Sequence, residues 1–308
     1  MRIISIDMNH DHVYANSMTA CIGYFDGMHK GHQALVKKTI ELADKYHCET
    51  GMITFDPDPW VPIKGIQNVR HITTMRERIN RAVELGIQNI VILRFTKEMS
   101  QLSPEEFVHK ILGKLHLKAL VCGFDFHYGY MGKGDAESLA RDAGIEVAVV
   151  APVTDEKGKI SSTRITNAIE NGNMEEAYSM LGYFFTMEGT VIHGRHVGTG
   201  IGYPTANIEY SGEYIQPKGG VYAGFAWING KRYETMINYG HNPTFNYRNE
   251  MSLEANIFDF HDSIYGKCIR LEFVHYLRGE TRFHSRDNLI MQLEQDERNT
   301  RKILAAYE

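Results

Sequence analysis

Two histidines three residues apart are the first side chains along the chain that could act on a phosphate. His29 and His32 lie in the segment GYFDGMHKGHQAL, between a short apolar run and a run with helical periodicity. A helix that follows a strand presents unpaired N–H groups, and Gly23 and Gly31 let the backbone approach an anion closely. Imidazole donors there would stabilise charge when a nucleoside triphosphate is attacked at its α-phosphorus. The same side chains could be exposed turn histidines, and the spacing leaves both interpretations open.

A second polar segment, KISSTRI, places hydroxyl side chains in front of a predicted helix. Ser161, Ser162 and Thr163 could cap that helix, which is a common use of serine and threonine. They could instead bind phosphate. Taken alone, the residues favour the capping role.

The segment VCGFDFHYGYMGKGD lies between these two motifs and follows an apolar run. It is polar, aromatic and rich in glycine. As a plain loop it needs no function. Its aromatic side chains around Asp125 nevertheless suit a planar heteroaromatic ligand.

Oxygen donors gather again in the second half of the chain, in GTVIHGRHVGTGIGYPTANIEY and SLEANIFDF. The first segment carries Thr205 and Asn207 and could be an ordinary glycine-rich hairpin loop. In the second, strand alternation places Glu254 on the same face as Asn256. A surface-facing glutamate is the simpler interpretation of Glu254 from the strand pattern alone.

Elements of two kinds must position these groups. From residue 19 to about 152, four or so short apolar runs alternate with helical patterns, which favours a parallel sheet covered on both faces. One helix is predicted to begin with Ser103 as N-cap and Pro104 at its first position.

After residue 184 short strand-like runs dominate, and Asn229-Gly230 predicts a two-residue hairpin. The fold class is therefore an α/β domain followed by a small antiparallel β-barrel and a C-terminal helix at about 285–307.

The composition excludes several classes of protein. Of 308 residues, 43% are hydrophobic and 23% charged, and the net charge is -5. No apolar run approaches the roughly 20 residues that cross a bilayer, the N-terminus lacks a signal-peptide layout, and the scattered cysteines argue against a disulfide framework. Acidic residues outnumber basic ones by 38 to 33, which argues against nucleic acid as a partner. We expect a cytoplasmic monomer or weak homo-oligomer that binds small molecules, with no membrane role.

Taken in order, the motifs resemble those of bifunctional prokaryotic FAD synthetases. HKGH is similar to the HxGH pattern of nucleotidyltransferases, and KISSTRI to the ISSTxIR-like segment on the far side of their triphosphate. GYPTAN after GTVIHG resembles the riboflavin kinase signature, which NYGHNPTF and YLRGETRF complete. The resemblance implies a Rossmann-like FMN adenylyltransferase domain at residues 1–184 and a riboflavin kinase domain at 185–308. Riboflavin and ATP would give FMN and ADP, and FMN and ATP would then give FAD and pyrophosphate, with Mg²⁺ as the metal.

The resemblance also assigns roles to single residues. Glu254 orients or deprotonates the riboflavin 5′-hydroxyl, and His29 and His32 act on the triphosphate. Thr205 and Asn207 hold Mg²⁺ with ATP. The flavin contacts are Asp125, Phe126 and Arg278. The nucleotide and phosphate contacts are Gly23, Phe25, Gly31, Ser161, Ser162, Thr163, Arg164, Gly194, Thr205 and Asn207.

The chain departs from the family pattern at a few positions. FDPDP places Asp58 where FxPHP has a histidine, and a carboxylate repels a triphosphate unless a cation compensates. Thr199 and Val197 replace frequent basic residues in the kinase loop, and Tyr203 replaces phenylalanine. Our hypothesis is that both activities persist, with adenylylation and nucleotide affinity weakened.

Two alternatives remain open. The chain could be a single-activity relative, a riboflavin kinase with weakened adenylylation, or a non-catalytic regulator that binds flavin or nucleotide. Retention of Glu254 favours an enzyme, because a binding module needs no base at that position.

Overall fold

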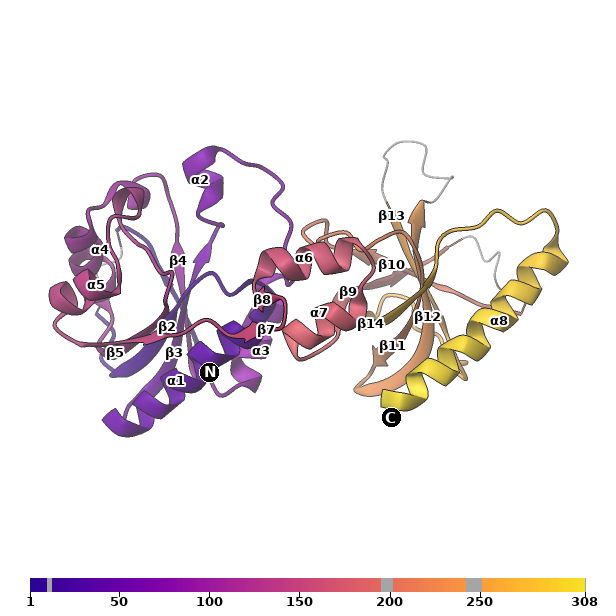
Figure 1. Ribbon diagram of the computed structural model, residues 1–308, viewed down its shortest axis with the longest axis horizontal. Coiled ribbons are helices and arrows are strands. Elements are labelled where there is room, and N and C mark those ends of the chain that lie inside the picture. Colours follow the sequence, from indigo (N-terminus) through magenta and orange to yellow (C-terminus); the bar gives the residue numbers. More distant parts are fainter. Residues whose placement is uncertain (10–12, 195–201, 242–250, 308) are drawn as a thin grey trace. The chain divides into compact units, whose positions relative to one another are not determined.

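The computed structural model describes residues 1–9, 13–194, 202–241 and 251–307. It divides into two compact units, Met1–Ser162 and Thr163–Glu308 (Figure 1). Thr199, Val197 and the end of NYGHNPTF lie outside the described residues. The predicted boundary at residue 184 concerns the division between two activities, so it stays a prediction.

The first unit is built on a parallel sheet of order β1-β4-β3-β2-β5-β6. Its strands are β1 Arg2–Ile6, β2 Met18–Ile22, β3 Glu49–Asp56, β4 Asn89–Arg94, β5 Leu117–Gly123 and β6 Glu146–Val150. All its ladders are parallel, which confirms the predicted sheet type. The expectation of four or so strands was too low, since the sheet has six. The N-terminal run RIISI was missed because it is followed by another strand, β2, and so falls outside the alternation of strands and helices.

Helices cover both faces of this sheet, and strand alternation divides the core accordingly. The helices are α1 Lys30–Tyr46, α2 Trp60–Lys64, α3 Met75–Glu84, α4 Pro104–Lys110 and α5 Ala136–Ala143. Ile22 and Leu120 pack with α4 and α5, whereas Cys21 and Val121 pack with α1 and α3. A short hairpin, β7 Thr154–Asp155 and β8 Gly158–Lys159, follows β6.

The predicted start of α4 is confirmed. Ser103 is its N-cap and accepts a hydrogen bond from the N–H of Glu106 at 3.1 Å, while Pro104 occupies the first turn. The Glu106 side chain accepts in return from the N–H of Ser103, which completes a capping box.

The second unit is a closed antiparallel barrel of order β10-β13-β12-β11-β14-β9. Its strands are β9 Phe185–Ile192, β10 Ala206–Tyr210, β11 Gly220–Ile228, β12 Lys231–His241, β13 Met251–Ile257 and β14 Cys268–Arg278. Its helices are α6 Ser162–Glu170, whose first residue belongs to the first unit, α7 Met174–Leu181 and α8 Arg286–Leu304. The predicted barrel and C-terminal helix are confirmed.

The predicted hairpin at Asn229-Gly230 is also confirmed. Both residues have positive φ, 51° and 79°, as a tight two-residue turn between β11 and β12 requires.

Candidate active sites

The first unit has a cavity of about 960 Å³ at the carboxyl ends of its strands. The residues that end β2, β5 and β6 line it, and the strand order changes direction between β2 and β5. This is where open α/β sheets bind ligands. The cavity brings together predicted site residues from segments far apart in sequence. They are Gly23, Phe25, His29, Gly31, His32, Asp125, Phe126, Ser161 and Ser162.

His29 is the N-cap of α1. Its Nδ1 accepts hydrogen bonds from the N–H groups of Gly31 at 3.1 Å and His32 at 3.4 Å. A Cβ at residue 31 would lie 2.9 Å from His29 Cε1, so this approach requires glycine. Because Nδ1 is the acceptor, the neutral ring carries its proton on Nε2. These two helix N–H groups are therefore bound to His29, and the ring retains Nε2–H as a donor.

His32 stacks on His29, with ring centroids 3.7 Å apart and planes inclined by 17°. Among the described residues, no group hydrogen-bonds the buried Nδ1 of His32. Burial, reinforced by the charge of Lys159, lowers the pKa of His29 to about 4. Burial also lowers the pKa of His32 well below its usual range. At neutral pH the pair is therefore uncharged and acts through hydrogen bonds.

Lys159 is a cavity residue that the sequence interpretation missed. Its Nζ lies 2.5 Å from Asp125 Oδ2 and 4.5 Å from the ring centroid of Phe124. It is the first residue of KISSTRI, where the hydroxyl groups drew attention away from it. The site therefore has a side-chain cation in addition to the neutral histidines.

Asp58 also lines the cavity and is 8% exposed. Its Oδ1 accepts a hydrogen bond from the N–H of Trp60 at 2.7 Å, so it closes a turn at the start of α2. The carboxylate that replaces the family's histidine therefore has a structural partner of its own.

Aromatic side chains form a large part of the cavity wall. Phe126 stacks on Tyr128 with ring centroids 5.8 Å apart and planes inclined by 13°. The other aromatic lining residues include Phe55, Trp60, Phe95, Phe124 and Tyr130. This wall suits the planar ligand that the sequence predicted near Asp125.

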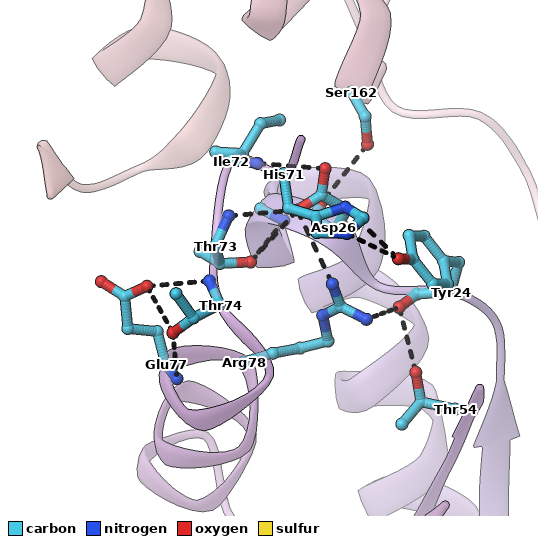
Figure 2. A network of polar contacts seen from close by, with 11 residues as sticks. Tyr24, Asp26, Thr54, His71, Ile72, Thr73, Thr74, Glu77, Arg78 and Ser162 are labelled. Atoms are coloured by element: carbon cyan, nitrogen blue, oxygen red, sulfur yellow. Dashed lines mark hydrogen bonds and ion pairs between the residues drawn. The ribbon is translucent and has the colours of Figure 1, made fainter. Parts of the chain in front are cut away.

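The predicted phosphate ligands of KISSTRI are divided between the two units. Ser161 and Ser162 line the cavity, and Ser162 Oγ donates to the carbonyl of Asp26 at 3.1 Å (Figure 2). Thr163 and Arg164 belong to the second unit. There Arg164 Nη2 lies 3.8 Å from Glu176 Oε1 on α7.

The predicted kinase residues meet on adjacent strands of the barrel. Asn207 of β10 lies directly opposite Glu254 of β13, and the Thr205 side chain hydrogen-bonds Glu254. Asn256 Nδ2 donates to the carbonyl of Pro204 at 2.7 Å, so Asn256 and Glu254 reach the same segment, as strand alternation predicts. Burial raises the pKa of Glu254, although the Thr205 hydrogen bond opposes this.

Gly194 supports the same constellation. A Cβ at this position would lie 2.0 Å from Nδ2 of Asn207, so any larger residue would displace that amide. Gly194 therefore allows the Asn207 amide to keep its position, because glycine has no side chain.

The oxygen atoms of the barrel residues could hold Mg²⁺ only together with a bound substrate. Thr205, Asn207 and Glu254 present hydroxyl, amide and carboxylate oxygens, the hard donors that Mg²⁺ prefers. In the described part of the chain, no cluster of three or more His, Cys, Asp or Glu side chains forms a self-sufficient metal site. Mg²⁺ that keeps several waters and substrate phosphates suits such a set.

Arg278, a predicted flavin contact, makes a close ion pair with α8. Its Nε and Nη2 donate to Oδ2 of Asp296 at 2.9 and 2.7 Å, and Asp296 is buried. Gln292 donates to the other oxygen of Asp296 at 2.8 Å. Tyr203 also reaches α8, through a side-chain hydrogen bond to Glu297.

Comparisons with known proteins show which family the chain resembles. Residues 12–164 match the family model of FAD synthetase, and residues 181–304 match that of riboflavin kinase. The bifunctional riboflavin kinase/FMN adenylyltransferase of Listeria monocytogenes is 40% identical over 93% of this chain and 92% of its own. The Bacillus subtilis protein of the same description is 34% identical over 89% of each chain.

A crystal structure described as a macrolide-efflux protein from Streptococcus pneumoniae has a TM-score of 0.90 and 36% identity. It covers 97% of this chain and 99% of its own. Its description applies to that protein, and the likeness confirms the fold. No helix in the described part of this chain is long and apolar enough to cross a membrane. The resemblance seen in the motifs is confirmed over most of the chain, which belongs to the family of bifunctional riboflavin kinase/FMN adenylyltransferases.

Proposed function

We propose that this chain makes FAD in two steps, by phosphorylating riboflavin with ATP and then adenylylating FMN with a second ATP. One observation carries the proposal: each unit assembles its own set of polar groups suited to one of the two reactions. The histidine pair and Lys159 line one cavity, while Thr205, Asn207 and Glu254 meet on the barrel. Neither a single-activity relative nor a regulator would need both sets.

In the kinase step Glu254 is the general base. It accepts the proton of the riboflavin 5′-hydroxyl as that oxygen attacks the γ-phosphorus of ATP, and ADP leaves. Burial raises the pKa of this carboxyl, which makes Glu254 a better proton acceptor than an exposed carboxylate. Thr205 and Asn207 would hold Mg²⁺, which neutralises phosphate charge when bound.

In the adenylylation step the substrate brings its own nucleophile. The phosphate of FMN is largely a dianion at neutral pH, because its second pKa is about 6, so no protein base is needed. It attacks the α-phosphorus of ATP, and pyrophosphate leaves. His29 and His32 stabilise the growing charge as neutral N–H donors, while Lys159 and the hydroxyl of Ser161 bind phosphate oxygens. The Ser162 hydroxyl donates to the Asp26 carbonyl and would bind phosphate only by giving up that bond.

The aromatic wall that includes Phe126 would hold the flavin ring, and Lys159 would exchange Asp125 for phosphate when the substrates bind. The role of Arg278 as a flavin contact in the kinase unit stays a prediction. So do the cytoplasmic location, the monomeric or weakly oligomeric state and the absence of a nucleic-acid partner.

The test is to incubate the purified chain with riboflavin, ATP and Mg²⁺ and to separate the flavins by chromatography over time. We expect FMN to rise first and FAD to follow, with pyrophosphate released in proportion to FAD. A parallel reaction starts from FMN, and a second contains EDTA. FMN without FAD would contradict the second activity, and neither product would contradict the whole proposal.

A further inference from the structure

A buried arginine next to the first cavity has no part in the reactions described above. Arg78 of α3 is 1% exposed and does not line the cavity. Figure 2 shows its contacts with Tyr24 and Asp26. Its Nη1 donates to the carbonyl of Tyr24 at 2.9 Å, and its guanidinium lies 4.4 Å from the centroid of the Tyr24 ring. Its Nη2 lies 3.8 Å from Oδ1 of Asp26. The direct hydrogen bond therefore goes to the backbone just before the histidine motif.

That backbone is strained. Phe25, Gly27 and Met28 all have positive φ, at 61°, 75° and 36°. Phenylalanine and methionine rarely adopt this conformation, and it persists only where the surroundings impose it. This turn sets the direction in which the chain enters α1, and so it sets where His29 lies.

Asp26 connects the turn to its surroundings in two directions. Its carboxylate accepts hydrogen bonds from the N–H of Ile72 at 3.2 Å and from the N–H of Thr73 at 3.1 Å. Its carbonyl accepts from Ser162 Oγ at 3.1 Å. One residue therefore joins the turn before His29 to the segment that carries the opposite phosphate-binding hydroxyls (Figure 2).

The contacts of Arg78 are not those of an optimised buried salt bridge. A charge-assisted N–H···O⁻ bond is normally about 2.7–2.9 Å long, whereas the Arg78–Asp26 separation is 3.8 Å. Among the described residues, no group accepts from the buried Nε of Arg78. The guanidinium is directed instead at the Tyr24 carbonyl, which Thr54 Oγ1 also approaches, at 3.0 Å.

We propose that Arg78 is a positioning residue for adenylyl transfer. Acting through the Tyr24 carbonyl and Asp26, it holds the strained turn and so fixes the position of His29 and His32 relative to Ser162. It touches no substrate. This inference depends on the proposed adenylylation, since it assigns a support to that site.

The charge of Arg78 has a second consequence at the same place. Three groups from different elements act on His32: His29 of α1, Arg78 of α3 and Lys159 of β8. After burial, each of them lowers the pKa of His32. Removal of the Arg78 charge should therefore raise the pKa of His32, which gives a signal that needs no turnover.

The experiment compares Arg78→Met and Arg78→Lys with Arg76→Met in the intact chain. Arg76 is an exposed arginine of the same helix, which makes it the matched control. FAD formation from FMN and ATP is measured as kcat and as KM for each substrate. Riboflavin phosphorylation is measured on the same preparations. Histidine ring signals are followed by NMR as the pH is changed.

For Arg78→Met we expect kcat for FAD formation to fall about 100-fold, the effect of a displacement near 1 Å at a reacting group. Both KM values should stay within about threefold, because no substrate contact is lost. Arg78→Lys keeps the positive charge but lacks the several N–H donors of a guanidinium. Its kcat for FAD formation should be about tenfold higher than that of Arg78→Met. Arg76→Met and riboflavin phosphorylation should match the wild type.

Several results would overturn the proposal. One is an unchanged kcat in a folded Arg78→Met chain. Another is a rise in KM at constant kcat, which would indicate a substrate contact. If Arg78→Met does not fold, the same two criteria apply to Arg78→Lys. If the wild type makes no FAD, the proposed function fails instead, and unchanged His29 and His32 NMR signals in Arg78→Lys would then overturn the positioning role.

Discussion

The two sites are held in place by different kinds of structure. On the barrel, Asn207 and Glu254 face each other because β10 and β13 pair in register. The hydrogen bonds that form the barrel therefore also place the site. In the first unit, His29 and His32 follow a turn with left-handed residues, which depends on side chains such as Arg78 for its shape.

This difference predicts different sensitivities. A pair of hydrogen-bonded strands tolerates changes outside the site, because many backbone hydrogen bonds together hold the strands in register. A strained turn depends on the particular side chains that hold it, and a substitution that touches no substrate can displace it. Each reaction is also a control for the other, because both take place on one chain.

The largest effect should come from Glu254→Gln. The amide keeps the size of the side chain but cannot accept the riboflavin proton, so kinase turnover should fall about 100- to 10,000-fold. FAD formation from supplied FMN should be unchanged. Both rates are measured by chromatography of the flavins on one preparation.

Glu213 offers a matched control, since it is an exposed glutamate outside the motifs of either site. Glu213→Gln makes the same chemical change as Glu254→Gln, and it should leave phosphorylation unchanged. Equal kinase rates in Glu254→Gln and the wild type would show that the base lies elsewhere.

Much of the fold could be predicted because its signals are local. Alternating strands and helices, the Ser103-Pro104 helix start and the Asn229-Gly230 turn all lie within a few residues of the structure they specify. Strand β1 escaped prediction because the next element along the chain is strand β2. It therefore falls outside the alternation of strands and helices from which the sheet was predicted.

The residues of the two candidate sites also differ in whether a local sequence pattern reveals them. The histidines, hydroxyls and Glu254 stand in short motifs, so sequence reasoning could propose them as site residues. Lys159 lay inside a motif and was missed because only its hydroxyl groups were considered. Arg78 lies in an amphipathic helix, where an arginine is normally exposed, and only the folded chain shows that it is buried against Tyr24.

A smaller effect should come from Asp58→His, which restores the family's residue. It removes a carboxylate from the cavity and adds a donor, so KM for ATP in adenylylation should fall about fivefold, equivalent to about 1 kcal/mol. The hydrogen bond to the Trp60 N–H is lost, which should lower the free energy of unfolding by about 1 kcal/mol. The measurements are FAD formation at varied ATP and denaturant unfolding.

Asp56→His is the control, because Asp56 is exposed and does not line the cavity. A decrease of 100-fold or more in the KM for ATP of Asp58→His would mean that Asp58 strongly weakens ATP binding in the natural chain. An unchanged KM would mean that the cation of Lys159 already compensates the carboxylate.

The smallest effect concerns pH and distinguishes a neutral histidine from a charged one. The pKa of His29 is about 4 in the folded chain, below its ordinary value of 6.5, so the folded state binds fewer protons between these values. The stability that His29 contributes is therefore present above pH 6.5 and is lost as the pH falls towards 4. In His29→Asn the asparagine oxygen can still cap α1, but it does not titrate. The unfolding free energy of this variant should therefore fall less steeply than that of the wild type between pH 6.5 and 4.

His109→Asn, at an exposed histidine of α4, should behave like the wild type. Equal slopes in His29→Asn and the wild type would show that burial does not keep His29 neutral, and the first site would then have to act through charge.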